Sequence, residues 1–131
     1  MRSIDETSGP WVGWSIQYGL RIHERMILRV GGGTISGSGE DADGDFDLDG
    51  NYDAGGDVAI VRRYTYCTSG PEGIGIPYLY RGRWDGAQVT GTWKPVISLY
   101  GTDGGPFEMW PEDGNLEVSF EVSRQQEPVK T

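Results

Sequence analysis

Residues 77–93 read PYLYRGRW-DG-AQVTGTW, two alternating runs on either side of the pair Asp85-Gly86. An Asp-Gly pair supplies residues that tolerate positive φ, and between alternating runs it is a strong signal for a tight β-hairpin. Tyr78, Tyr80 and Trp84 have the same parity and therefore point to one face of their strand. The stretch predicts a hairpin with a row of aromatic side chains on one side.

The same pattern of short alternating runs and glycine-rich breaks extends outward in both directions. It predicts strands at 11–17, 25–30, 34–38, 46–52, 58–66, 77–84, 87–93, 106–110 and 116–122. No segment has a convincing helical period. Because closure removes exposed strand edges, we expect an all-β fold, a single up-and-down antiparallel barrel of about eight strands. The main alternative is a two-sheet sandwich with Greek-key connections. Residues 10–123 form the predicted barrel domain, with flexible ends at 1–9 and 124–131.

Composition supports a β-protein and excludes several partners. The chain has 131 residues, of which 22 are glycine, and its formal net charge is −9. An acidic surface repels phosphate backbones and anionic lipids, so we expect neither nucleic-acid nor membrane partners. No signal peptide is visible, and the single cysteine, Cys67, excludes an internal disulfide. The expected location is the cytoplasm.

Five short stretches resemble the avidin/streptavidin family, in that family's order. They are Trp14–Gly19, Gly33–Gly37, Phe46–Asp53, Tyr80–Gly82 and Ala87–Trp93. The resemblance implies an avidin-like or calycin-like barrel with Tyr80 and Trp93 as pocket walls. It also implies side-by-side association into a homodimer or homotetramer.

The departures from that family concern the groups that hold biotin. Ile16 and Leu20 stand where the resemblance implies Asn and Ser, Gly39 replaces a Tyr, and Ile76 and Tyr78 replace Ser and Thr. Each buried polar group of a ligand left without a partner costs about 1–3 kcal/mol. We therefore expect no biotin binding.

Aromatic side chains and two adjacent arginines are the candidate ligand-binding residues. In an eight-stranded barrel they either fill the interior or surround one small ligand. One of Arg62 and Arg63 points inward, because adjacent strand residues face opposite ways. An inward arginine is expected to pair either with a core carboxylate or with an anionic ligand. The candidate residues are Trp14, Tyr78, Tyr80, Trp93, Arg62 and Arg63.

An acidic segment, residues 40–57, is the strongest local charge signal. The spacing Asp45-x-Asp47-x-Asp49-Gly50 matches the start of a calcium loop, but Gly56 stands where that loop requires a bidentate Glu. The favoured interpretation is a strand with one solvated face, which deters edge pairing. Weak calcium binding is the alternative, with Asp41, Asp43 and Asp45 as candidate ligands.

Catalysis is disfavoured by the inventory of side chains. His23 is the only histidine, and no motif surrounds Cys67. We expect neither an enzyme nor a cofactor. The leading hypothesis is a non-catalytic barrel that binds a small, partly apolar organic molecule. The alternative is an interaction or oligomer-forming β-module with a filled barrel and no ligand.

Overall fold

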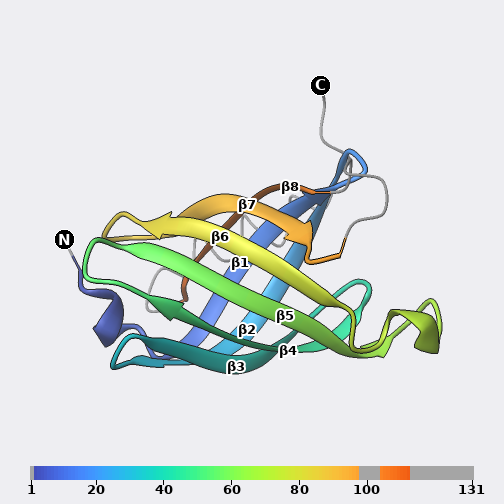
Figure 1. Cartoon of the computed structure of the whole chain (residues 1–131), viewed down its shortest axis with the longest axis horizontal. Helices are drawn as coiled ribbons and strands as arrows, with labels where there is room; N and C mark the ends of the chain where they lie inside the picture. The colour runs from blue at the N-terminus through green and yellow to red at the C-terminus, as the bar shows by residue number, and fades with distance from the viewer. Residues whose placement is uncertain (1, 98–103, 113–131) are drawn as a thin grey trace.

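The computed structural model describes residues 2–97 and 104–112. These residues form eight antiparallel strands and two single-turn 3₁₀ helices (Figure 1). The strands are β1 (Gly9–Gln17), β2 (Leu20–Gly31), β3 (Thr34–Asp41), β4 (Gly44–Tyr52), β5 (Asp57–Cys67), β6 (Pro77–Trp84), β7 (Val89–Pro95) and β8 (Gly105–Pro111). The helices are η1 (Ile4–Glu6) and η2 (Pro71–Gly73). Within the described ranges, no helix is long and apolar enough to cross a membrane.

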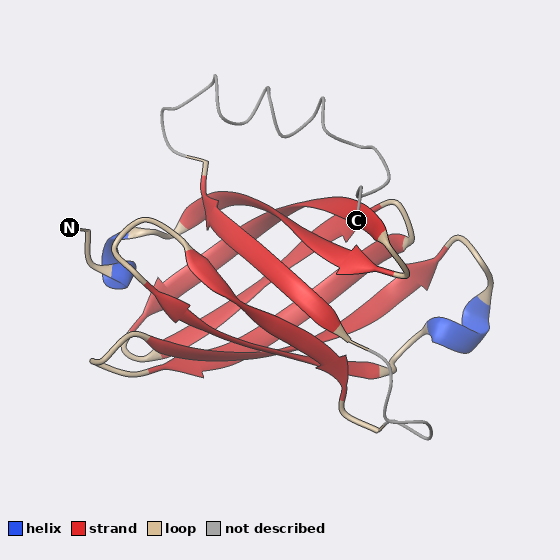
Figure 2. Ribbon diagram, turned by 90° about the horizontal axis from the view of Figure 1, so that it is seen from above, coloured by secondary structure: helices blue, strands red, loops and turns tan. Residues whose placement is uncertain are grey.

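Each strand pairs with its sequence neighbours, and β8 pairs with β1 to close the barrel. The closing register places Trp14 opposite Glu108 and Val12 opposite Trp110. Figure 2 shows the front and back walls crossing obliquely, with η1 and η2 at opposite ends. The prediction of a single up-and-down barrel is confirmed, and the two-sheet alternative is wrong.

The predicted strands correspond to observed ones, with shifts at their ends. The Asp85-Gly86 turn is longer than predicted, because Trp84 pairs with Val89 and four residues form the connection. Asp85 Oδ1 accepts hydrogen bonds of 2.9 Å from the amides of Ala87 and Gln88, an Asx-type turn. The ninth predicted strand, 116–122, and the predicted C-terminal tail, 124–131, lie outside the described residues.

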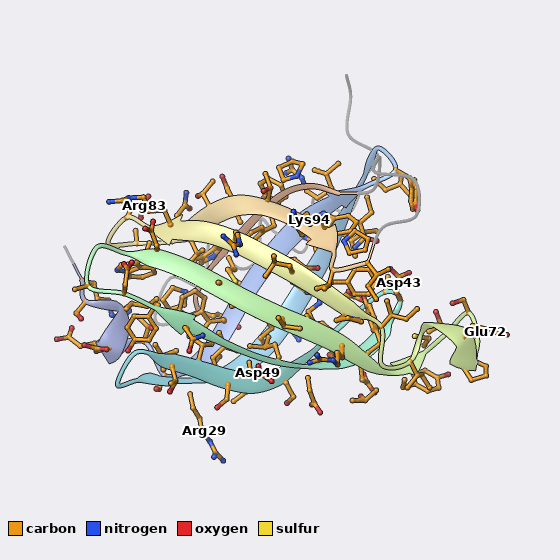
Figure 3. The ribbon with its side chains drawn as sticks, viewed as in Figure 1. Arg29, Asp43, Asp49, Glu72, Arg83 and Lys94 are labelled. Carbon is orange, nitrogen blue, oxygen red and sulfur yellow. The ribbon has the colours of Figure 1, made fainter. Side chains whose placement is uncertain are left out.

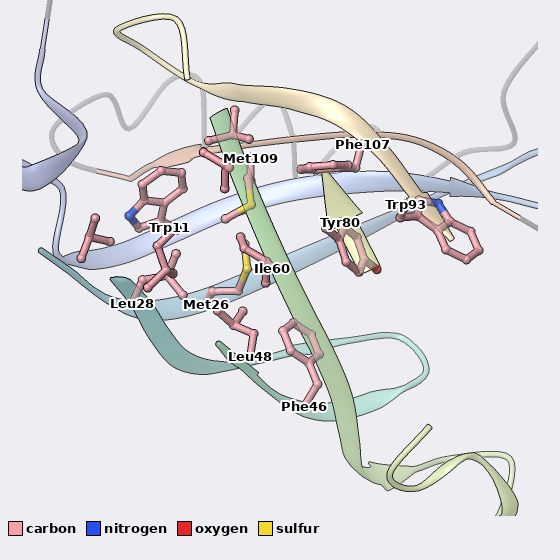
Figure 4. Packing of buried hydrophobic residues seen from close by; sticks show 14 of the residues in the cluster. Trp11, Met26, Leu28, Phe46, Leu48, Ile60, Tyr80, Trp93, Phe107 and Met109 are labelled. Atoms are coloured by element: carbon pink, nitrogen blue, oxygen red, sulfur yellow. The ribbon is translucent and has the colours of Figure 1, made fainter. Parts of the chain in front are cut away.

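Alternation of buried and exposed side chains, clearest in β4, separates the barrel interior from its outer surface. In β4, Phe46 and Leu48 are buried, whereas Asp45, Asp47 and Asp49 are exposed. The solvated-face interpretation of the acidic segment is therefore confirmed for this strand. Figure 4 shows the interior side chains packed between opposite walls. They include Trp11, Met26, Leu28, Phe46, Ile60, Tyr80, Phe107 and Met109.

Glycines allow the strands to bend sharply enough for closure. A Cβ atom on Gly37 would lie 2.1 Å from the Ile27 carbonyl oxygen. On Gly91 it would lie 1.9 Å from the Arg81 carbonyl oxygen. Such close approach of neighbouring backbones is the property of corner glycines in small barrels. Some of the glycines are therefore needed within strands, where neighbouring backbones approach closely, and others are needed in turns.

The N-terminal segment packs against one end of the barrel. Ile4 of η1 is buried in the core, Trp11 Nε1 donates to the Thr7 carbonyl at 2.7 Å, and Trp84 Nε1 donates to the Arg2 carbonyl at 2.8 Å. Residues 2–9 of the segment predicted to be flexible thus contain η1 and lie against the barrel. The sequence does not indicate this packing, because a single isoleucine among polar residues shows no periodicity. The contact between Arg2 and Trp84 also joins residues too far apart in sequence to leave a local pattern. We call this end the closed end and the opposite one the mouth.

Candidate functional site

A pocket of about 310 Å³ lies at the mouth of the barrel. It is bounded by strand ends, by the β1–β2 and β3–β4 turns, and by the loop that carries η2. Tyr18 and Ser69, which line it, are exposed, so the pocket opens to solvent. Its lining residues are Gln17, Tyr18, Asp43, Tyr64, Cys67, Ser69, Gly73, Tyr78, Tyr80, Trp93 and Pro95. The volume is at the lower end of the range for small-molecule sites.

Aromatic rings in mutual contact form one wall of the pocket. Tyr64 and Tyr78 meet edge to face at 6.2 Å between centroids, and Tyr78 and Trp93 meet at 6.2 Å. Tyr80 stacks on Trp93 at 6.4 Å, with the planes inclined by 28°. Trp93 is fixed by its own donor, because its Nε1 gives a 3.0 Å hydrogen bond to the Ile16 carbonyl. Figure 4 shows Tyr80 and Trp93 side by side at one end of the core.

Arg62 lies buried inside the barrel, next to Tyr64 and Tyr80 of the aromatic wall. Its Nη1 donates to Glu24 Oε2, and its Nη2 donates to Asp41 Oδ2 at 2.9 Å. The Tyr64 hydroxyl donates to the same Asp41 oxygen at 2.6 Å. The guanidinium carbon also lies 3.8 Å from the Phe46 ring centroid and 4.8 Å from that of Tyr80. One cation is therefore held by two carboxylates and by aromatic faces.

The protonation of this cluster follows from burial and mutual attraction. Burial raises the pKa of Glu24, and the nearby Arg62 only partly offsets that effect. For Arg62, burial alone would lower the pKa, but the attraction of Glu24 and of the surrounding groups raises it well above its ordinary value. Arg62 thus keeps its charge.

The tyrosines of the site remain neutral hydrogen-bonding groups. Burial raises the pKa of both Tyr64 and Tyr80 well above the ordinary range, and Arg62 only partly opposes this. Tyr80 is 5% exposed. Its hydroxyl has no hydrogen-bond partner among the residues that the structure describes. This phenol is therefore available to a ligand in the pocket.

Asp43 brings a carboxylate to the pocket from the β3–β4 turn. The turn is tied to the end of β5, because the Thr68 amide donates to the Asp43 carbonyl at 2.9 Å. The Asp43 amide in turn donates to Asp41 Oδ1 at 2.8 Å. Figure 3 shows Asp43 toward the end that carries Glu72, away from Arg83. Partial burial, and then repulsion by Asp41, raise the pKa of the Asp43 carboxyl.

The structure brings together three of the aromatic candidates and separates the fourth. Tyr78, Tyr80 and Trp93 line the pocket. Trp14 does not, since alternation places it on the face of β1 opposite Ser15, where the Arg21 guanidinium lies 4.6 Å from its ring centroid. The interior tryptophan of β1 is Trp11.

No protein-family model matches this sequence, and no curated protein does.

The two arginines separate as the sequence predicted, one inward and one outward. Arg62 is 2% exposed, whereas Arg63 is exposed on the outer face opposite Asp47. Arg63 does not line the pocket. Both terminal nitrogens of Arg62 bind carboxylates of the chain, so the core-partner alternative is correct. Arg62 is not among the residues that line the pocket.

The candidate calcium ligands do not converge. Asp41 uses Oδ1 for the amides of its own turn and Oδ2 for Arg62 and Tyr64. Asp43 faces the pocket, and Asp45 lies on the outer face of β4. Among the described residues, no group of three or more His, Cys, Asp or Glu side chains is placed to hold a metal ion.

Several pocket residues were not found from the sequence. Tyr64 has the same parity as Arg62, so alternation alone places it inside the barrel. Tyr18, Asp43 and Cys67 reach the pocket from turns and strand ends, where parity gives no direction. The partners of Arg62 were also unassigned, since a chain with 20 acidic residues offers too many choices.

Proposed function

We propose that this protein is a non-catalytic binding barrel that takes one small, partly apolar organic molecule into its mouth. The observation that carries the proposal is the solvent-open pocket of about 310 Å³ walled by Tyr64, Tyr78, Tyr80 and Trp93. At ≈ 30 Å³ per water molecule, this equals roughly ten waters of liquid volume. The pocket therefore has space for a molecule much smaller than the interior of a large lipid-binding barrel.

The rigidity of the wall supports binding without a large conformational change. Trp93 is held by a hydrogen bond, Tyr64 by Asp41, and the two are bridged by Tyr78. Preorganised aromatic surfaces lose little side-chain entropy when a ligand is bound. The unpartnered Tyr80 hydroxyl and the Asp43 carboxylate add polar groups that orient a ligand.

Tryptophan fluorescence tests the proposal, since a ligand in the mouth contacts Trp93 and displaces water from it. Small amines, alcohols and carboxylates are titrated into the protein, and saturable changes in emission are expected for at least one class. Trp93→Phe should abolish the response. Trp14→Phe is the matched control, because Trp14 lies on the outer face, and it should retain the response. If no compound changes the emission or the melting temperature, the binding function is wrong.

A further inference from the structure

The charges around the pocket determine which kind of ligand it favours. Among the described residues that line the pocket, Asp43 is the only aspartate or glutamate, and there is no lysine, arginine or histidine. Behind the aromatic wall, Arg62 is already paired with Glu24 and Asp41. An anionic ligand would therefore meet no uncompensated positive charge in the described part of the site.

The barrel interior already contains a cation that is bound in this way. Arg62 lies against the rings of Phe46, Tyr64 and Tyr80, with 3.8–5.7 Å between its guanidinium carbon and the ring centroids, and contacts two carboxylates. At the mouth the same groups recur without a cation of the chain, namely tyrosine and tryptophan rings with the Asp43 carboxylate. Aromatic faces within about 6 Å attract ammonium groups, particularly where water is partly excluded.

We propose that the ligand is an organic cation, with an alkylated ammonium group held between Asp43 and the aromatic wall of Tyr64, Tyr78 and Trp93. This inference rests on the proposed binding function and names its substrate class. The methyl groups of such a cation contact the rings, and the pocket volume of about 310 Å³ accommodates a trimethylammonium group with a short substituent.

The β1–β2 turn contributes a further aromatic ring, that of Tyr18, to the lining of the pocket. Tyr18 has φ = 51° and Gly19 has φ = 77°, a combination that favours Asn-Gly over Tyr-Gly. The Tyr18 side chain is nevertheless 91% exposed while lining the pocket. A bulky residue in the left-handed region is unfavourable for folding, and such residues concentrate at ligand sites. Its ring would become buried against a cation in the mouth.

Three probes of similar shape and different charge test the proposal. They are choline, its neutral isostere 3,3-dimethyl-1-butanol, and the anion 3,3-dimethylbutyrate, titrated at constant ionic strength with tryptophan emission as the readout. We expect choline to bind about tenfold or more tightly than the alcohol, and the carboxylate to bind most weakly. If the alcohol or carboxylate binds as tightly as choline, the cation inference is wrong and the binding function stands. If none binds, the cation inference is overturned, whereas the binding function is overturned only if the wider screen of amines, alcohols and carboxylates also fails.

Two substitutions with the same change in net charge locate the interaction. Asp43→Asn should weaken choline binding about five- to tenfold and leave the alcohol unaffected. Asp45→Asn is the matched control, because Asp45 lies two residues away on the outer face of β4, and it should change neither. Equal effects of the two substitutions on choline would show general attraction to an acidic protein and would overturn the role of Asp43.

Discussion

Tyr80 and Trp93 are opposite each other on β6 and β7, and their rings stack with centroids 6.4 Å apart. Phe107 also contacts Tyr80, edge to face, with 5.1 Å between the ring centroids. Tyr80 therefore joins the hydrophobic core to the pocket, and its ring and its hydroxyl have separable roles.

Substitutions at Tyr80 should distinguish those roles. Tyr80→Phe keeps the ring contacts and removes a hydroxyl without a partner in the described structure, so the free energy of unfolding should change by less than about 1 kcal/mol. Tyr80→Ala should lower it by about 3–5 kcal/mol, because it leaves a cavity between Trp93 and Phe107. Urea denaturation measures both values. A large loss in Tyr80→Phe would show that the hydroxyl has a structural partner.

Removing the buried cation should destabilise the barrel strongly. Arg62→Met leaves Glu24 and Asp41 without their counter-charge, which should cost about 3–5 kcal/mol. Combining it with Glu24→Gln and Asp41→Asn should recover most of that loss, since no charge then remains uncompensated in the interior. Denaturant midpoints of the single and triple variants provide the comparison. A triple variant as unstable as Arg62→Met would mean that shape, rather than charge, is the essential contribution of Arg62.

The stability of the protein should depend on pH through Glu24. Burial raises the pKa of Glu24 in the folded state above its ordinary value, so the folded protein binds the proton more tightly than the unfolded chain. The resulting stabilisation is complete below the unfolded pKa and is lost as pH rises through the folded pKa. Glu24→Gln should lack this dependence and be at least as stable as the native protein at pH 7. Unfolding free energies measured from pH 4 to pH 8 check both expectations, and identical pH profiles would contradict them.

Tyr18→Asn should increase stability and reduce binding. Asparagine tolerates the left-handed conformation better than tyrosine, so the free energy of unfolding should rise by about 1 kcal/mol. The same substitution removes a ring from the pocket rim and should weaken choline binding. Tyr18→Phe is the control for the ring and should behave like the native protein in both measurements. Unchanged choline affinity in Tyr18→Asn would remove Tyr18 from the site.

The single thiol, Cys67, reports the electrostatic potential inside the pocket without any ligand. Two methanethiosulfonate reagents, one with a trimethylammonium group and one with a sulfonate group, are compared. The ratio of the cationic to the anionic reaction rate should be higher for Cys67 than for a small free thiol. Asp43→Asn should reduce this preference severalfold. Mass spectrometry follows the reaction over time. A preference for the anionic reagent would contradict the acidic character assigned to the mouth.

The sequence predicted the barrel well because its signals are local and repeated. The alternation of Phe46 and Leu48 with Asp45, Asp47 and Asp49 placed the interior correctly, and the parity of Tyr78 and Tyr80 placed one pocket wall. Long-range choices were not predictable. Nothing near Ile4 indicates that it packs into the closed end, and nothing near Arg62 selects Glu24 and Asp41 from the other acids.

The position of Arg62 also has a consequence for folding. Glu24 and Arg62 are 38 residues apart in sequence and belong to strands that are not neighbours in the sheet. Because strand side chains alternate with a period of two, sliding β5 by one residue would move Arg62 to the outside, and a slide that brings Val61 into its place would leave both carboxylates inside without a counter-charge. Hydrophobic residues tolerate such errors far better than ions do. We therefore expect the ion pairs of Arg62 with Glu24 and Asp41 to disfavour a barrel in which β5 is out of register in that direction.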